Sequence, residues 1–179
     1  MSLMSQISTI PFVLCALVVA LFGCHAHEHD DDDVGNDPVS TTIKHSCVHF
    51  DAGPAKVVTL AGASGAAPDL TVEHHRHDLI FVALQSDQKG GDGVWKVAEK
   101  GEYLIMLSDD VPVVLLDKDG QVASAEKTLS KPVAGCDAAA LGHLYDLTLG
   151  TWTLRFGPTA ASGVKMTFGA VENDAHAAH

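Results

Sequence analysis

The chain has 179 residues, with 11 Lys plus Arg against 23 Asp plus Glu and a formal net charge of −12. This length suits one domain, and so acidic a chain is poorly suited to neutralising phosphates, so we expect no binding to nucleic acid. The sequence contains no phosphate-binding loop, dinucleotide fingerprint or nucleophile elbow. No carboxylate pair, Ser–His pair or activated Cys stands out either, so we expect that the protein is not an enzyme.

The N-terminus has the features of an export signal. Residues 10–22 form an uncharged apolar stretch, which is too short to cross a bilayer of about 30 Å comfortably. It ends in Leu21-Phe22-Gly23-Cys24, which resembles the lipobox of bacterial lipoproteins, where the Cys is lipidated and becomes the mature N-terminus. The resemblance implies a lipid-anchored protein of the bacterial cell envelope, periplasmic or at the cell surface, with the outer membrane favoured. The alternatives are an ordinary cleaved signal and an uncleaved anchor, both with an unmodified Cys.

Residues 24–42, which follow the predicted signal of residues 1–23, have the composition of a disordered tether. They carry His25, His27 and His29, six acidic residues and no Lys or Arg, and they show no apolar periodicity. Imidazole suits zinc, nickel and copper, and neighbouring carboxylates attract cations. The composition therefore predicts a fast, unselective metal catcher, and the alternative is a solvated spacer.

Residues 43–172 predict one all-β domain. They contain short runs of strand length, rich in β-branched and aromatic residues and separated by Gly, Pro and Asp. These runs are residues 56–60, 78–84, 94–98, 102–107, 111–116, 121–123, 144–149, 151–156 and 164–171. We expect an antiparallel β-sandwich of jelly-roll or Greek-key type.

Individual runs predict particular strand positions. Residues 117–120, Asp-Lys-Asp-Gly, have the composition of a tight hairpin turn. Trp152, Leu154 and Phe156 alternate with polar residues, so this strand should bury one face. Residues 79–84 are apolar at every position, which predicts a central strand buried on both faces.

Two predicted strands open with the pattern Gly-x-aromatic. Residues 101–103 read Gly-Glu-Tyr, and residues 150–154 read Gly-Thr-Trp-Thr-Leu. These openings resemble those of bacterial pre-peptidase C-terminal domains, which are β-sandwiches. The resemblance implies the same fold class, and it assigns no functional residues.

The four Cys residues divide into two pairs. Cys15 lies in the signal and Cys24 in the lipobox, which leaves Cys47 and Cys136 for the folded part. In an oxidising compartment these two should form a disulfide, which on the chain-entropy model stabilises the fold by about 4 kcal/mol. The alternative is a thiolate metal ligand, because Cys47 stands midway between His45 and His49.

The positions of the His residues in the domain also predict a metal site. In a strand, His75 and His77 would point to the same face. The disulfide would draw the neighbourhood of His49 towards that of His143. These residues could supply three imidazoles to a zinc ion, with copper and nickel as alternatives and the fourth position open. The competing interpretation is separate His residues with ordinary roles.

The sequence as a whole predicts an envelope protein that binds transition metals, zinc first. It would act as a scavenger or buffer, or as an accessory to a metal transporter. The predicted flexible tail, residues 173–179, adds His176 and His179. Because imidazole binds metals in its neutral form, we expect affinity to weaken below about pH 6. The alternative is a non-enzymatic envelope interaction module that binds protein or glycan and whose His residues are incidental.

Overall fold

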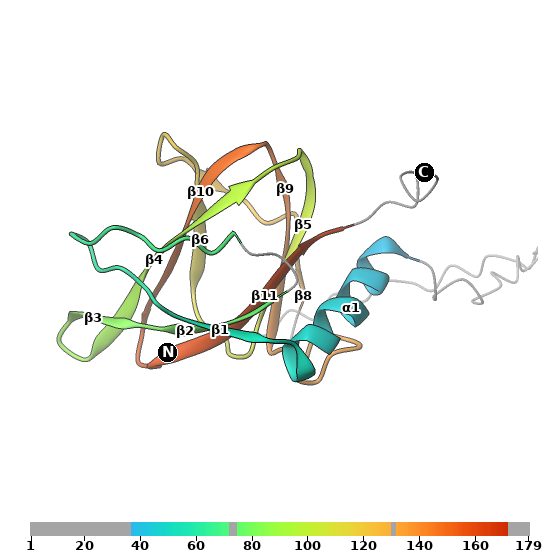
Figure 1. The fold of residues 1–179 in the computed structure, drawn as a ribbon, viewed down its shortest axis with the longest axis horizontal. Helices are drawn as coiled ribbons and strands as arrows, with labels where there is room; N and C mark the ends of the chain where they lie inside the picture. Colours follow the sequence, from blue (N-terminus) through green and yellow to red (C-terminus); the bar gives the residue numbers. More distant parts are fainter. Residues whose placement is uncertain (1–36, 72–74, 130–131, 172–179) are drawn as a thin grey trace, which may run out of the picture. The chain divides into compact units, whose positions relative to one another are not determined.

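The computed structural model describes residues 37–71, 75–129 and 132–171. They form two β-sheets and a helix that packs against the larger sheet (Figure 1). Every strand pair described is antiparallel except β1 with β2, which is parallel. The predicted all-β sandwich is therefore confirmed.

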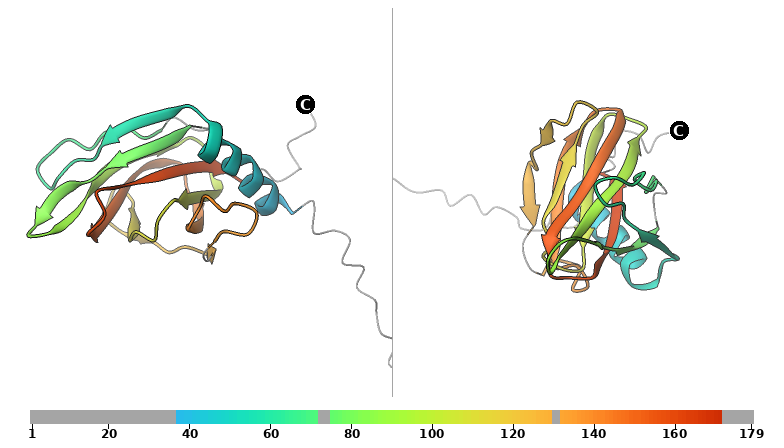
Figure 2. Two further views of the ribbon diagram at one scale, coloured as in Figure 1. Left: turned by 90° about the horizontal axis from the view of Figure 1, so that it is seen from below. Right: turned by 90° about the vertical axis from the view of Figure 1, so that its left-hand side faces the viewer.

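The strand order brings together segments that are distant in the sequence. The six-stranded sheet consists, in spatial order, of β1 (Ala55–Thr59), β2 (Arg76–Ile80), β11 (Gly163–Ala170), β5 (Gly101–Leu107), β9 (Leu141–Leu147) and β8 (Lys127–Leu129). The five-stranded sheet consists of β3 (Val82–Gln85), β4 (Gln88–Val97), β10 (Gly150–Thr159), β6 (Val113–Leu116) and β7 (Val122–Ala123). The helix α1 (Pro38–Ala52) lies outside these two layers, against β11 and β5 (Figure 2).

The main core lies between the sheets, and β10 shows how the sequence directs side chains into it. Trp152, Leu154 and Phe156 are buried in this core, whereas Thr151 and Arg155 are exposed, as the alternation predicts. The tight turn is also confirmed, because the amide of Gly120 donates to the carbonyl of Asp117, and β6 pairs with β7 across it.

A second, smaller core lies on the outer face of the six-stranded sheet, beneath α1. Strand β5 contributes to both cores. Ile105 and Leu107 face the five-stranded sheet, whereas Leu104 and Met106 pack towards the helix. This explains why β5 is apolar at successive positions, since both of its faces are covered.

The prediction of one central strand over residues 79–84 is wrong. The chain changes sheets at Phe81, so that β2 ends at Ile80 in one sheet and β3 begins at Val82 as an edge of the other. Phe81 is buried in the main core between the two layers, while Ile80 and Leu84 remain partly exposed. Residues 79–84 are therefore continuously apolar because the chain crosses here from one sheet to the other.

Folded structure begins before residue 43, the predicted start of the domain. Pro38 opens α1, and the Asp37 carboxylate caps it by accepting a hydrogen bond from the amide of Ser40 at 3.2 Å. Thr42 and Ile43 are buried. The remaining predicted tether, the predicted signal with Cys24, and the predicted tail lie outside the described residues. Within the described ranges, no helix is long and apolar enough to span a membrane.

The predicted disulfide is confirmed and fastens α1 to the sheet. Cys47, near the middle of the helix, bonds to Cys136 with a Cα–Cα distance of 5.4 Å. Cys136 is buried in the smaller core, in the turn segment that precedes β9. The bridge joins residues 89 positions apart, so it closes most of the folded chain into a loop.

Replacing both Cys47 and Cys136 by Ala should lower the free energy of unfolding by about 4 kcal/mol. The reason is that the unfolded chain regains the conformational freedom removed by a crosslink of this span. Urea denaturation followed by circular dichroism would measure the change. Dithiothreitol should lower the stability of the wild type by a similar amount and leave the variant unaffected. Equal stability of the variant and the oxidised wild type would contradict this role.

Candidate metal centre

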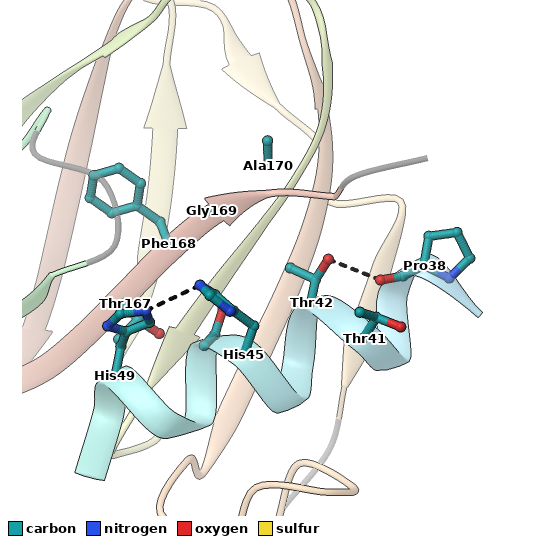
Figure 3. A pocket seen from close by; sticks show the side chains of 10 residues that line it. Pro38, Thr41, Thr42, His45, His49, Thr167, Phe168, Gly169 and Ala170 are labelled. Atoms are coloured by element: carbon teal, nitrogen blue, oxygen red, sulfur yellow. Dashed lines mark hydrogen bonds between the residues drawn. The ribbon is translucent and has the colours of Figure 1, made fainter. Parts of the chain in front are cut away.

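Helix α1 places two imidazoles side by side. His45 and His49 are four residues apart, which puts them on one face of the helix. Their Nε2 atoms lie 3.1 Å apart, at hydrogen-bond distance, with one ring donating and the other accepting. The ring centroids are 4.7 Å apart and the ring planes are inclined by 59°. Both imidazoles sit on the side of α1 that faces β11 (Figure 3).

The separation of the two nitrogens matches that of a chelating pair. Zinc–imidazole bonds of about 2.0–2.1 Å place two nitrogens roughly 3.3 Å apart at a tetrahedral angle and about 2.9 Å apart at a right angle. The observed 3.1 Å between the Nε2 atoms of His45 and His49 lies between these values. A metal ion that replaced the shared proton would lie to one side of the line between the two nitrogens, so both rings would have to turn towards it.

A cavity of about 190 Å³ lies beside this pair, between α1 and β11. Helix residues, including His45 and His49, form one wall, and residues 167–170 of β11 form the other (Figure 3). The space exists partly because Gly169 has no side chain, since a Cβ built at this position would meet no atom within 4 Å. Gly169 pairs with Leu104, whose side chain belongs to the smaller core, so this position faces the helix.

Thr167 brings a polar group to the same cavity. It pairs with Met106 of the smaller core, so it too faces α1, and its side chain lines the cavity. Thr167 is only 3% exposed, and its Oγ1 has no hydrogen-bond partner within the part of the chain described. A buried hydroxyl without a partner is energetically unfavourable. It is therefore a group that a ligand could satisfy.

Three attachments hold α1 in place at this cavity. Asp37 caps its first turn, and the Cys47–Cys136 bridge anchors its middle. At its end, Arg76 of β2 donates to the carbonyl of Phe50 at 3.1 Å while forming an ion pair with Asp78. The two imidazoles are thus held on a fixed scaffold.

The disulfide also removes the alternative of a thiolate ligand. The sulfur of Cys47 is bonded to Cys136 and is not available to a metal. In a helix, moreover, Cys47 points away from the face that carries His45 and His49.

His77 lies in a different environment from the one predicted. It shares a face with Leu79, as its spacing predicts, but this face is the core, and His77 is fully buried with its ring 5.5 Å from that of Phe168. Neither ring nitrogen has a hydrogen-bond partner among the residues described. Burial, reinforced by the charge of Lys56, lowers the pKa of His77 to about 4. His77 is therefore a neutral core residue.

His143 contacts residues of its own sheet. It lies half-buried on β9, where its Nδ1 is 3.2 Å from the hydroxyl of Thr128 on β8 and its ring is 6.0 Å from that of Tyr145. Burial lowers the pKa of His143, and the charge of Asp110 partly opposes this shift. Burial also raises the pKa of Tyr145 to about 12.

The predicted cluster of His49, His75 or His77, and His143 is therefore not assembled. Within the described ranges, no three His, Cys, Asp or Glu side chains lie close enough together to hold a metal ion. His75 is half-buried and directly precedes β2. The tether residues His25, His27 and His29 and the tail residues His176 and His179 lie outside the described residues.

Sequence reasoning missed His45 as the partner of His49 because it did not predict the helix. Two signals were available. Asp37-Pro38 is a typical helix start, and Ile43, Cys47 and Phe50 follow the i, i+4, i+7 spacing of a buried helical face. Once the helix is known, the four-residue spacing of the two His residues places them together.

The chain matches no family model, and no curated protein matches it significantly.

The burial of His77 predicts a loss of stability in acid. Its pKa is about 4 in the folded protein, against about 6.5 for an exposed imidazole, so the unfolded state binds more protons between these values. The contribution of this residue to the free energy of unfolding should therefore fall by about 3 kcal/mol as the pH drops from above 6.5 to 4. Chemical denaturation at several pH values would measure the change.

His77→Leu provides the matched control for this pH dependence. Leu cannot bind a proton and fills a similar apolar space, so the stability of the variant should depend less on pH over the same interval. Parallel pH profiles of the variant and the wild type would show that other groups cause the acid sensitivity.

Proposed function

We propose that the protein is an exported, lipid-anchored envelope protein that binds a transition-metal ion through His45 and His49. Zinc is the first candidate, with copper and nickel as alternatives. In this proposal the protein acts as a metal scavenger or buffer, or as an accessory to a membrane transporter. The tether histidines capture ions and pass them to the helix.

The observation that carries the proposal is the 3.1 Å separation of the two Nε2 atoms on one helix face. A bidentate pair held by a rigid scaffold binds more tightly than two independent imidazoles, because little conformational freedom is lost when the second nitrogen binds. Imidazole nitrogen also selects for borderline ions such as Zn²⁺, Cu²⁺ and Ni²⁺ over Ca²⁺ and Mg²⁺, which prefer oxygen ligands.

The charge distribution of the sequence supports capture of cations. Residues 24–42 hold six of the 23 acidic residues of the chain and no Lys or Arg. Such a segment raises the local concentration of cations near the domain to which it is joined. Its chain enters the fold at Pro38, which itself lines the cavity beside the His pair.

Substituting His45 or His49 by Ala should lower the affinity for Zn²⁺ at least about tenfold, which corresponds to 1.4 kcal/mol, because only one imidazole remains. The measurement is calorimetric titration of the full chain with zinc and with copper(II) at neutral pH. Since tether imidazoles would bind as well, the experiment uses a background in which His25, His27 and His29 are replaced by Ser.

The matched controls are His75→Ala and His143→Ala in the same background. Both residues belong to the site predicted from the sequence, but the structure places neither in the pair on α1, so their affinity for zinc should equal that of the background. If His143→Ala reduced binding as much as His49→Ala, the pair on α1 would not be the site. Absence of binding by the unsubstituted chain would reject the metal function and favour an envelope interaction module.

A further inference from the structure

We infer that the cavity between α1 and β11 is a binding site for a small neutral organic molecule with a compact apolar body and one hydroxyl or carbonyl group. The apolar body fills the cavity, and the polar group forms a hydrogen bond with the hydroxyl of Thr167. This binding goes beyond the proposed function, because it uses no metal ion and no coordination by His45 or His49. It holds whether or not the protein binds zinc.

The first argument is the size of the cavity. Its volume is about 190 Å³. Because an apolar cavity of about 150 Å³ can hold a benzene ring, this cavity has room for roughly one six-membered ring and a substituent. Gly169 of β11 provides part of this room, since a Cβ built on it would meet no atom within 4 Å.

The second argument is the chemistry of the walls. Among the described residues, no Lys, Arg, Asp or Glu side chain lines the cavity. Pro38, Gly169 and Ala170 line it without any polar side-chain atom. The hydroxyl of Thr42 already donates to the carbonyl of Pro38, at 2.9 Å (Figure 3). A charged ligand would lose its hydration here without a Lys, Arg, Asp or Glu to pair with, so the walls favour a neutral molecule.

The third argument is the hydroxyl of Thr167. The Thr167 side chain lines the cavity and is only 3% exposed, and its Oγ1 has no hydrogen-bond partner in the part of the chain that the structure describes. This oxygen can donate one hydrogen bond and accept others. A hydroxyl or carbonyl group of a ligand would remove the cost of leaving it unpaired. Of the described lining residues, Thr167 alone has such a group, so the ligand needs only one polar group.

Titration of the full chain with phenol, toluene and benzoate tests the inference, followed by heteronuclear NMR at pH 8 with EDTA and no added metal. Phenol has one hydroxyl, toluene has the same size and no hydroxyl, and benzoate has a negative charge. Phenol should bind and shift the amide signals of residues 167–170, and benzoate should bind at least about tenfold more weakly. If phenol does not bind, or if benzoate binds more tightly than phenol, the inference is overturned.

Substitutions of Thr167 test the hydrogen bond. Thr167→Val keeps the shape of Thr and removes the hydroxyl, so the ratio of phenol affinity to toluene affinity should fall about three- to tenfold. Thr167→Ser keeps the hydroxyl and should keep a ratio close to that of the wild type. A general disturbance of the fold would weaken both ligands and leave the ratio unchanged. An unchanged ratio in Thr167→Val would therefore contradict the role of this hydroxyl.

Two glycine variants test the place of binding. Gly169→Val narrows the cavity and removes no polar group, and the φ angle of Gly169 is not positive, so it should weaken both phenol and toluene at least about tenfold. Gly101→Val is the matched control. Gly101 lies in β5 of the same sheet, its Cβ would also meet no atom within 4 Å, and it does not line the cavity.

The control should bind phenol and toluene as the wild type does, and circular dichroism verifies that both variants are folded. If Gly169→Val and Gly101→Val bind phenol equally well, the ligand does not lie in this cavity and the inference fails. All these variants keep His45 and His49, and the titrations contain no metal. Failure of the proposed function, measured by zinc titration, is therefore distinguishable from failure of the cavity inference.

Discussion

The attachment of α1 to the outer face of the six-stranded sheet is the constraint on which the candidate site depends. A helix of 15 residues has little stability alone, so tertiary contacts must hold it. Here the Cys47–Cys136 bridge, the smaller core around Phe50 and the hydrogen bond from Arg76 provide these contacts. They hold in place the face of α1 that carries His45 and His49, and a cavity remains between this face and β11 beside Gly169.

Burial decides which His residues are suited to bind a metal. His77 is fully buried and its pKa is low, so an ion there would lose its hydration in an apolar surrounding. His45 is exposed and His49 is half-buried, so an ion bound to them keeps contact with water. The fold explains this difference in burial. Strand β2 directs His77 into the main core, whereas helix α1 carries His45 and His49 along its side.

Much of the fold could be predicted from local patterns, and the site could not. The alternation around Leu154 gave the buried face of β10, and counting Cys residues gave the disulfide. The first feature depends only on residues adjacent in the sequence, and the second on the two Cys residues that remain once those of the predicted signal and lipobox are set aside. The helix was missed because its apolar face is short and partly made of Thr42, Ser46 and Cys47, which a hydrophobic pattern does not detect. The pairing of His49 with His45 follows only from the helix, since in a strand a four-residue spacing would separate them by about 13 Å.

The metal site proposed on α1 fits exchange of an ion better than structural support. Structural zinc sites are closed by four protein ligands, and their metal is required for folding. In this chain a disulfide and two hydrophobic cores hold the fold together. The proposed site would therefore serve exchange of the ion, which a buffer or a transporter accessory needs, and the stability of the fold would rest on the disulfide and the two cores.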